Sequence, residues 1–393
     1  MIANGLGVTL ISSQPQWGGG EQWLWSLGKG LSQIGVRVHW IAPENSPLGQ
    51  RLQQSSFSWL PVQGKGRSLR DLSAIRGFIR RSDIDVIHFN DSHAVIGTSL
   101  AVLDCRRIAR VWTKHTIFPL RWRQKYRWMI DRVVCVSRAA QQAVIDCGLR
   151  AEQTSVIYGA VDEPQFDASA RSLLLHELNW SEPSQVIMCV GNLLACKGHR
   201  FAVEAMPKIL QRHPHAKLVI AGEGKERNEL ERIINTLHLH DSVKLLGFRS
   251  DATRLLSAAD VVVQPSLSEA LSLVAIESQM LLKPLVATAV GGLSEVVHAD
   301  LEAPLAELIR PESSDDIARA VNVILLGGAE LQWRCQRAKA AAHDRFSMPR
   351  MVGEVLQVYE TLVQGRRGGR NSGQRSSHQG AHQEARPGIR QAS

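Results

Sequence analysis

Two glutamates, Glu269 and Glu277, lie eight positions apart where the chain passes from a strand to a helix. The strand is predicted over Val261 to Gln264, and Pro265 ends it. Apolar residues then recur at helical spacing from Leu273 onward, so Glu269 falls in the connecting loop and Glu277 about one turn into the helix. We therefore expect both carboxylates to face one pocket.

A strand-to-helix turn of this kind is where open α/β sheets bind ligands. The free amides at the predicted helix start, near Ser272, Leu273 and Val274, suit the phosphates of a nucleotide. Carboxylates beside such amides are best explained as acceptors for hydroxyl groups, as on a sugar and a ribose. The alternative is that Glu269 caps the helix and Glu277 is a solvated charge, and these two residues alone leave both interpretations open.

The run from Asp260 to Glu295 resembles the signature of family 4 glycosyltransferases, which have the GT-B fold. Further segments that match are Gly18 to Glu21, Val134 to Arg138, Val156 to Asp162, Gly191 to Gly198 and the helix around Met351 to Leu362. The resemblance covers residues 6 to 364. It implies an α/β protein with two facing Rossmann-like doubly wound parallel-sheet domains, an interdomain cleft and a C-terminal helix crossing back to the first domain.

Strand and helix patterns alternate from Val8 onward, become irregular from Asp162 to Pro183, and alternate again from Val186. This alternation predicts two doubly wound parallel sheets. We expect an acceptor-side Rossmann-like domain at 1–165, a nucleotide-sugar donor domain at 166–345, a helix at 346–364 that by resemblance packs back on the first domain, and a disordered basic tail at 365–393.

The composition is that of a globular protein, because 393 residues with 44% hydrophobic content suffice for two cores. No apolar run approaches the roughly 20 residues of a membrane span, so a cytoplasmic location is expected. Six scattered Cys without a CxxC pair indicate neither disulfides nor zinc. The net charge of +9 is concentrated in the tail, where six Arg face a single Glu and large apolar residues are scarce.

Three glycines, Gly18, Gly19 and Gly20, follow the first strand and precede a helix, which allows a phosphate to approach the backbone closely. The resemblance places this loop over the diphosphate of the donor. Lys197 follows the first strand of the second domain, where a cation would neutralise charge on a leaving diphosphate. The family has a Lys there and usually an Arg directly after the strand glycine, whereas this chain has Asn192.

A histidine, His115, lies just past a predicted strand on the cleft side of the first domain. The resemblance places it against the donor sugar, as a catalytic group. Lys114 beside it is expected to help fill the charge deficit left at position 192. His88 is interpreted as mostly structural, and Asp91 and His93 are candidates for the acceptor side.

The roles implied by the resemblance are binding of both ribose hydroxyls by Glu277 and of a sugar hydroxyl by Glu269. It also implies retention of anomeric configuration, with the leaving diphosphate assisting the incoming hydroxyl on the same side. No Asp-x-Asp metal site adjoins the cleft end of a strand. We expect no metal and no cofactor, with the nucleotide sugar as a substrate.

Cations alternate with aromatic residues from Arg121 to Trp128, and six cations lie between Lys65 and Arg81. Basic aromatic helices suit an anionic membrane surface, where Trp and Tyr lie at the headgroups. We therefore expect a peripheral position on the inner face of the cytoplasmic membrane. The alternative is that Trp122 and Trp128 are core residues of an ordinary amphipathic helix.

The leading hypothesis is a glycosyltransferase that moves a sugar from a nucleotide-sugar donor to a glycan or lipid-linked acceptor, in synthesis of cell-envelope polysaccharide or lipopolysaccharide. The alternative is a non-catalytic GT-B protein that binds a nucleotide sugar or a glycan, which Asn192 favours. No recognised nucleic-acid module accompanies the basic segments, so no specific nucleic-acid partner is expected.

Overall fold

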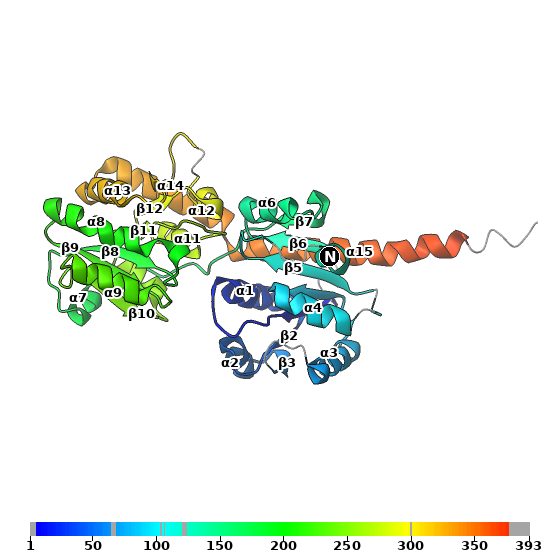
Figure 1. The fold of residues 1–393 in the computed structure, drawn as a ribbon. Helices are drawn as coiled ribbons and strands as arrows, with labels where there is room; N and C mark the ends of the chain where they lie inside the picture. The colour runs from blue at the N-terminus through cyan, green and yellow to red at the C-terminus, as the bar shows by residue number, and fades with distance from the viewer. Residues whose placement is uncertain are drawn as a thin grey trace, which may run out of the picture.

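The computed structural model describes residues 5–63, 68–102, 104–105, 107–119, 124–298 and 301–376. Two α/β domains lie side by side, each built on one parallel sheet (Figure 1). The first sheet has the strand order β3-β2-β1-β4-β5-β6-β7. Its strands are β1 (Gly7–Ile11), β2 (Arg37–Pro43), β3 (Ser58–Val62), β4 (Val86–Phe89), β5 (Ala109–Lys114), β6 (Arg132–Cys135) and β7 (Thr154–Val156). The helices between them are α1 (Gly19–Gln33), α2 (Pro47–Gln53), α3 (Leu69–Arg81), α4 (Ser92–Ala101), α5 (Gln124–Met129) and α6 (Arg138–Asp146).

The second sheet has the strand order β10-β9-β8-β11-β12-β13 and is also parallel. Its strands are β8 (Gln185–Val190), β9 (Ala216–Ala221), β10 (Val243–Gly247), β11 (Val261–Gln264), β12 (Leu285–Thr288) and β13 (Glu307–Ile309). The accompanying helices are α7 (Ala170–Glu177), α8 (His199–Arg212), α9 (Arg227–Thr236), α10 (Ala252–Ser257), α11 (Leu273–Met280), α12 (Gly291–Val296), α13 (Ser314–Leu326) and α14 (Ala329–Arg345). The predicted architecture of two doubly wound sheets is confirmed.

The central strands are largely buried because helices cover both faces of each sheet. In β11 the residues Val261, Val262 and Val263 have no exposed surface. The strand order reverses direction between β1 and β4 in the first sheet and between β8 and β11 in the second. Ligands of open α/β sheets bind beyond the carboxyl ends of the strands at such reversal points. The glycine loop follows β1, and the loop with Lys197 follows β8.

The last helix, α15 (Met348–Ser376), returns to the first domain and packs along α1 (Figure 1). Gly30 of α1 permits the close approach, since a Cβ there would lie 2.4 Å from Cγ2 of Val352. Further along α15, the hydroxyl of Tyr359 is 2.5 Å from Nδ1 of His88, and both residues are fully buried. The predicted crossing of the C-terminal helix is confirmed.

Helix α15 continues to Ser376, which differs from the predicted disorder beginning at residue 365. The reason is that the first basic residues of this segment find carboxylates on the first domain. Arg366 lies 2.7 Å from an oxygen of Asp131, and Arg367 lies 3.0 Å from an oxygen of Asp85. The rest of the predicted tail, 377–393, lies outside the described residues.

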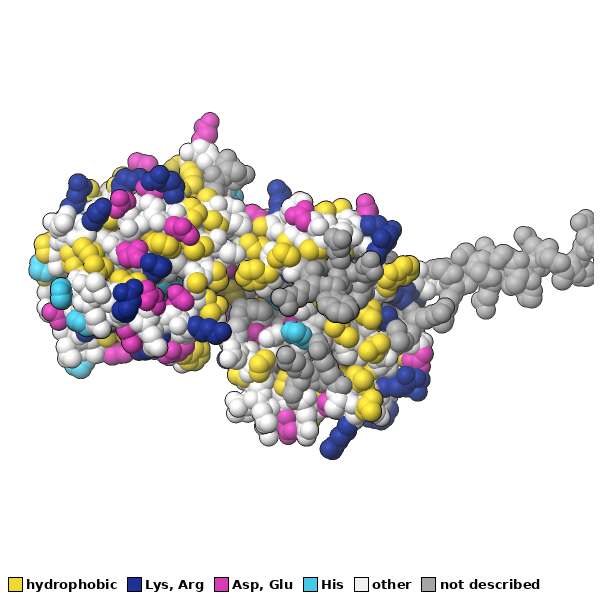
Figure 2. All heavy atoms as spheres, in the orientation of Figure 1, with side chains coloured by type: hydrophobic (Ala, Val, Ile, Leu, Met, Phe, Trp, Pro, Cys, Tyr) yellow, Lys and Arg dark blue, Asp and Glu magenta, His cyan; other side chains and the backbone are white. Residues whose placement is uncertain are grey.

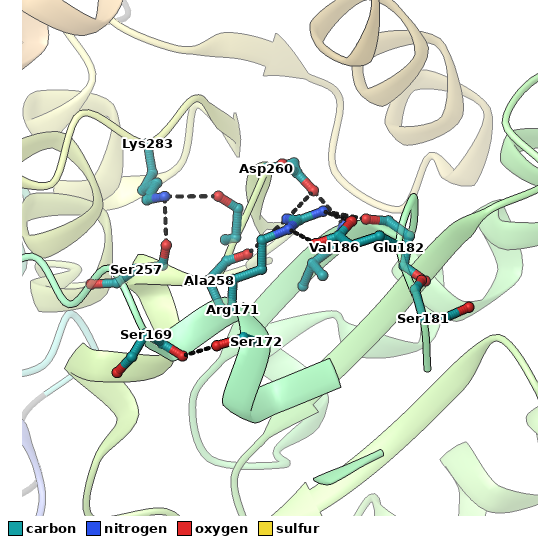
Figure 3. Close-up of polar contacts among 12 residues, drawn as sticks. Ser169, Arg171, Ser172, Ser181, Glu182, Val186, Ser257, Ala258, Asp260 and Lys283 are labelled. Carbon is teal, nitrogen blue, oxygen red and sulfur yellow. Dashed lines mark hydrogen bonds and ion pairs between the residues drawn. The ribbon is translucent and has the colours of Figure 1, made fainter. Parts of the chain in front are cut away.

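Helix α7 lies within the stretch that was expected to be irregular, and Arg171 ties it to the second sheet (Figure 3). The guanidinium of Arg171 lies 2.8 Å from Glu182 and 2.9 Å from Asp260, which directly precedes β11. Lys283 donates to the backbone carbonyls of Ser257 and Ala259 beside this cluster. These charged groups lie where strands begin, at the opposite end from the ligand-binding edge, so they stabilise the domain.

The two domains meet through the carboxyl-terminal edges of their sheets. A Cβ at Gly19 of α1 would lie 3.7 Å from Leu273 of α11, and one at Gly291 would lie 3.2 Å from Ile117. Figure 2 shows an indentation between the domains on one face, and acidic and basic side chains interspersed over the second domain. Within the described ranges, no helix is long and apolar enough to cross a membrane.

Candidate active site

The second domain contributes the loop from β8 to α8 to the candidate site between the domains. Lys197 ends a short 3-10 helix (Ala195–Lys197), and Gly198 follows it with φ 67°. A Cβ at Gly198 would lie 2.1 Å from the carbonyl oxygen of Pro265, so only glycine lets this loop pack against the end of β11. The loop thereby holds Lys197 beside the segment that carries Glu269.

Lys197 and Glu269 form an ion pair, with Nζ 2.5 Å from Oε2. Glu269 is 8% exposed, and the hydroxyl of Ser266 also donates to its Oε2 at 3.4 Å. Two residues that are 72 positions apart therefore meet because their strands, β8 and β11, are neighbours in the sheet. A phosphate that binds here can contact the ammonium of Lys197, and a neighbouring sugar hydroxyl can donate to the carboxylate of Glu269.

The first turn of α11 offers backbone donors to a ligand. Ser272 caps this helix, and its hydroxyl accepts from the amide of Ala275 at 3.2 Å. The amides of Leu273 and Val274 lie in the first turn, where backbone N–H groups have no acceptor within the helix. The interpretation in which Glu269 caps the helix is therefore wrong, because Ser272 does so and Glu269 is committed to Lys197.

Glu277 lies one turn into α11 and is half-buried. Burial raises the pKa of its carboxyl from 4.5 to about 7, although a 3.4 Å hydrogen bond from the hydroxyl of Thr253 partly offsets this effect. The interpretation of Glu277 as a solvated charge is therefore wrong. A carboxylate held in this way gains more from new hydroxyl donors than a hydrated one does.

The first domain contributes His115 at the end of β5 and the glycine loop at the start of α1. Gly18 is the extended N-cap of α1, and a Cβ at Gly20 would lie 3.3 Å from Cδ2 of His115. Trp23 contacts the ring of His115 edge-on, with centroids 5.4 Å apart. Burial lowers the pKa of His115 to about 3, and Lys114 contributes in the same direction, so the imidazole is neutral at pH 7.

The predicted donor contact at position 192 is exposed at the carboxyl end of β8. Asn192 therefore has room for a ligand, but its side chain carries no charge. Lys114 does not supply the missing cation, because its buried Nζ donates to Thr116 at 2.9 Å and to the carbonyl of Phe118 at 2.7 Å. The expectation for Lys114 was wrong, since its side chain holds its own loop.

Asp91 is structural rather than an acceptor-side group. It is the N-cap of α4 and accepts from the amide and the hydroxyl of Ser13, each at 2.7 Å. His88 is fully buried and bonded at both ring nitrogens, with Thr113 2.5 Å from Nε2, as its structural interpretation expects. His93 is exposed at the start of α4.

Two contacts at the site were not foreseen. Thr253 of α10 reaches Glu277, and Glu295 of α12 accepts from the amides of Arg138 and Ala139 at 2.9 Å each. Glu295 thus occupies the N-terminus of α6 in the other domain. Glu295 ends the run that resembles the family signature, and this position was a signal in the sequence. Its partner Arg138 lies 157 positions away, so only the fold reveals the contact.

No group of three or more His, Cys, Asp or Glu side chains with metal-binding geometry occurs in the part of the chain that the structure describes. The expectation that no metal is needed remains a prediction. In the second domain, Lys197 and the first amides of α11 supply the positive charge and dipoles that a diphosphate would require.

The arrangement of two facing sheets is that of the GT-B glycosyltransferases. The crystal structure of Anabaena Alr3699/HepE in complex with UDP-glucose has a TM-score of 0.79 at 23% identity, over 91% of this chain and 100% of that chain. Residues 172–342 match the profile described as Glycosyl transferases group 1, and residues 17–164 match Glycosyltransferase Family 4. The chain belongs to the family 4 glycosyltransferases.

Two relatives show how far this similarity extends. An uncharacterized glycosyltransferase of Methanocaldococcus jannaschii, MJ1607, is 30% identical over 240 residues, which are 59% of this chain and 60% of the relative. The N-acetyl-alpha-D-glucosaminyl L-malate synthase of Bacillus anthracis is 24% identical over 386 residues, which are 91% of this chain and 98% of the relative. The similarity thus reaches across both domains.

Proposed function

We propose that this chain is a retaining glycosyltransferase that moves a sugar from a nucleotide-sugar donor to a glycan or lipid-linked acceptor, in synthesis of cell-envelope polysaccharide or lipopolysaccharide. The observation that carries the proposal is the ion pair of Lys197 with Glu269, in the loop before α11, together with the buried carboxyl of Glu277 one turn into that helix. This point is the reversal of strand order in the second sheet, and α1 of the first domain faces it.

The donor is proposed to bind mainly to the second domain. Its diphosphate meets the ammonium of Lys197 and the first amides of α11, while the ribose hydroxyls donate to Glu277. Glu269 accepts from a hydroxyl of the sugar. The Anabaena relative was crystallised with UDP-glucose, which supports a nucleotide diphosphate sugar as the ligand class.

In the proposed reaction, the bond between the anomeric carbon and the diphosphate oxygen breaks, and the acceptor hydroxyl forms its new bond on the same side. The proton of that hydroxyl passes to the leaving diphosphate. Lys197 stabilises the charge that develops on the diphosphate, and its pairing with Glu269 holds the ammonium at that position before the donor arrives. Neutral His115 faces the site from the first domain.

A panel of nucleotide sugars tests the proposal by thermal shift, followed by turnover measurements with the donors that bind. A donor at 100 times its dissociation constant is expected to add about 2.7 kcal/mol of stability. Release of nucleoside diphosphate, by hydrolysis or transfer, identifies an enzyme. Donor binding without any release at all would contradict the proposal and favour the non-catalytic GT-B protein, for which the uncharged Asn192 is the supporting observation.

We further propose that the first domain docks on an anionic membrane from the cytoplasm, where a lipid-linked acceptor would lie. Trp128 is 84% exposed and Leu69 is 87% exposed on this domain. Tyr126 does not take part as expected, because it is buried and stacks on Trp112 with centroids 4.8 Å apart. Arg121, Trp122 and Arg123 lie outside the described residues.

Sedimentation with vesicles tests the membrane proposal on the full chain. The double variant Arg127→Glu with Trp128→Ser is expected to lose binding to phosphatidylglycerol vesicles, and wild-type binding is expected to weaken with salt. Trp333→Ser is the matched control, since Trp333 is 55% exposed on the second domain. Equal sedimentation of the double variant and the wild type would refute this docking surface.

A further inference from the structure

Three side chains of the first domain form a hydrogen-bonded series that leads from the start of α1 to His115. Nδ2 of Asn90 donates to Oε1 of Glu21 at 3.0 Å, and Oδ1 of Asn90 is 2.8 Å from Nε2 of His115. The hydroxyl of Ser12 also donates to Oε1 of Glu21, at 3.3 Å. Glu21 and Asn90 are 7% and 3% exposed, so water does not compete strongly for these bonds.

The direction of each bond follows from the acceptor-only character of an ionised carboxylate. Glu21 cannot donate, so the amide nitrogen of Asn90 must face it. The amide oxygen of Asn90 then faces His115 and requires a proton on Nε2. A neutral imidazole with its proton on Nε2 keeps a lone pair on Nδ1. Across the described part of the chain, no hydrogen-bond partner meets Nδ1 of His115.

The ring of His115 is also held in position by packing. Gly20, in the first turn of α1, lies against Cδ2, and Trp23 contacts the ring edge-on. Because Glu21 stands between these two residues in the same helix, α1 determines both the orientation of the imidazole and the direction of its hydrogen bonds. The half-buried ring retains access to the site between the domains.

We propose that Glu21 and Asn90 are positioning residues that hold His115 with its proton on Nε2, so that Nδ1 accepts a hydrogen bond from a substrate hydroxyl. The proposal rests on the sugar transfer proposed above. In this role Nδ1 of His115 accepts a hydrogen bond, which is impossible when Nδ1 carries a proton, as it does in the other neutral tautomer and in the imidazolium.

The electrostatics of the site agree with this role. Burial, with a smaller contribution from Lys114, lowers the pKa of His115 to about 3, so the ring stays neutral in ordinary buffers. Burial, with a smaller contribution from Asp91, raises the pKa of Glu21 to about 7. Measurements at pH 8 therefore examine the ionised carboxylate that the argument requires.

Two substitutions of nearly unchanged shape test the proposal. Glu21→Gln replaces the acceptor-only group by one that also donates, so the amide of Asn90 can turn over and the proton of His115 can move to Nδ1. Asn90→Asp places a second carboxylate 3.0 Å from the first. Each single variant is expected to lower kcat at least tenfold, with a smaller change in KM for the donor.

In the double variant Glu21→Gln with Asn90→Asp, the new amide at position 21 donates to the new carboxylate at position 90. That carboxylate in turn accepts from Nε2 of His115. The double variant is expected to recover most of the activity that each single change removes. A merely structural role predicts coupled changes in Tm without the loss and recovery of kcat, because the effects of contacting residues are not additive in either case. The control is Tyr359→Phe, which removes the buried bond to His88 and is expected to lower Tm without changing kcat.

Nitrogen-15 NMR of histidine-labelled protein at pH 8 reads the proton position directly, with His115→Ala identifying the resonances. The wild type is expected to show a protonated Nε2 and an unprotonated Nδ1, Glu21→Gln a shift toward Nδ1–H, and the double variant a return. A wild-type proton on Nδ1, or identical spectra in Glu21→Gln, overturns the proposal. This readout needs no donor, so absence of turnover in the wild type would refute the proposed function alone.

Discussion

Substitution of Glu277 by Gln separates the effect of the buried carboxylate on folding stability from its contribution to binding the donor. Burial raises the pKa of Glu277 from 4.5 to about 7, which means that the folded state favours the protonated form. A raised pKa contributes stability that is present below about pH 4.5 and is lost as the pH rises to about 7. At pH 8 the wild type therefore carries an unfavourable ionisation that Glu277→Gln lacks.

The size of this effect follows from about 1.4 kcal/mol for each pKa unit, which sets an upper limit of about 3 kcal/mol. We expect about 1 to 3 kcal/mol, because a half-buried carboxylate keeps part of its hydration. Glu277→Gln should therefore raise Tm by roughly 2 to 10 °C at pH 8 and hardly at all at pH 4.5. Donor binding should weaken at least tenfold, since each of the two ribose hydroxyls binds a charged acceptor about 1 kcal/mol more strongly than a neutral one, which makes about 2 kcal/mol together.

Scanning calorimetry between pH 4.5 and 8 measures the first effect, and titration with the nucleoside diphosphate that best stabilises the wild type measures the second. Glu302→Gln is the matched control, because Glu302 is exposed and should show no pH-dependent difference from the wild type. Parallel Tm profiles for Glu277→Gln and the wild type across this range would refute the assignment of a buried, destabilised carboxylate. Unchanged affinity for the nucleoside diphosphate would refute its role in binding ribose.

Lys197→Met should lower turnover at least tenfold and also lower Tm, because breaking a buried ion pair leaves the charge of Glu269 uncompensated. Adding Glu269→Gln should restore Tm but not turnover. Full turnover in Lys197→Met would exclude a contact between Lys197 and the diphosphate. Asn192→Arg should tighten binding of the nucleoside diphosphate in calorimetric titration, since an exposed cation is added beside the proposed diphosphate position, and weaker binding at unchanged Tm would contradict this geometry. Glu295→Ala should lower Tm because it removes the acceptors of the Arg138 and Ala139 amides and of the Tyr158 hydroxyl. The expected cost is at least about 1 kcal/mol, and an unchanged Tm would show that water replaces these acceptors.

Local patterns in the sequence predicted much of the fold because alternation of apolar strands and amphipathic helices is written in neighbouring residues. The strand Val261–Gln264 and the helix start at Leu273 were both predicted correctly, and Glu269 and Glu277 lie in the predicted loop and first turns. The short helix α7 was missed, because its apolar side becomes apparent only against the second sheet. The end of α15 was missed because Arg366 and Arg367 are held by distant carboxylates.

The residue types needed for nucleotide-sugar chemistry were also evident in the sequence, whereas their contacts were not. Asn90 was not among the predicted site residues, yet it joins Glu21 of α1 to His115. Tyr126 was grouped with membrane-facing aromatics, yet it stacks within the core. Such contacts depend on which strands become neighbours, and this information is not local.

The sequence by itself determined the two parallel-sheet domains, because strand and helix periodicities and turn residues act over short distances. The family and the segments that reach the site followed from the resemblance of the run Asp260 to Glu295 and of the shorter matching segments. Only the tertiary structure decided which charges meet there. Lys114 and Lys197 both lie at the carboxyl ends of strands, but one bonds its own loop and the other bonds Glu269. The reason is that the direction of a side chain depends on the buried acceptors that packing brings within its reach, and those come from distant parts of the chain.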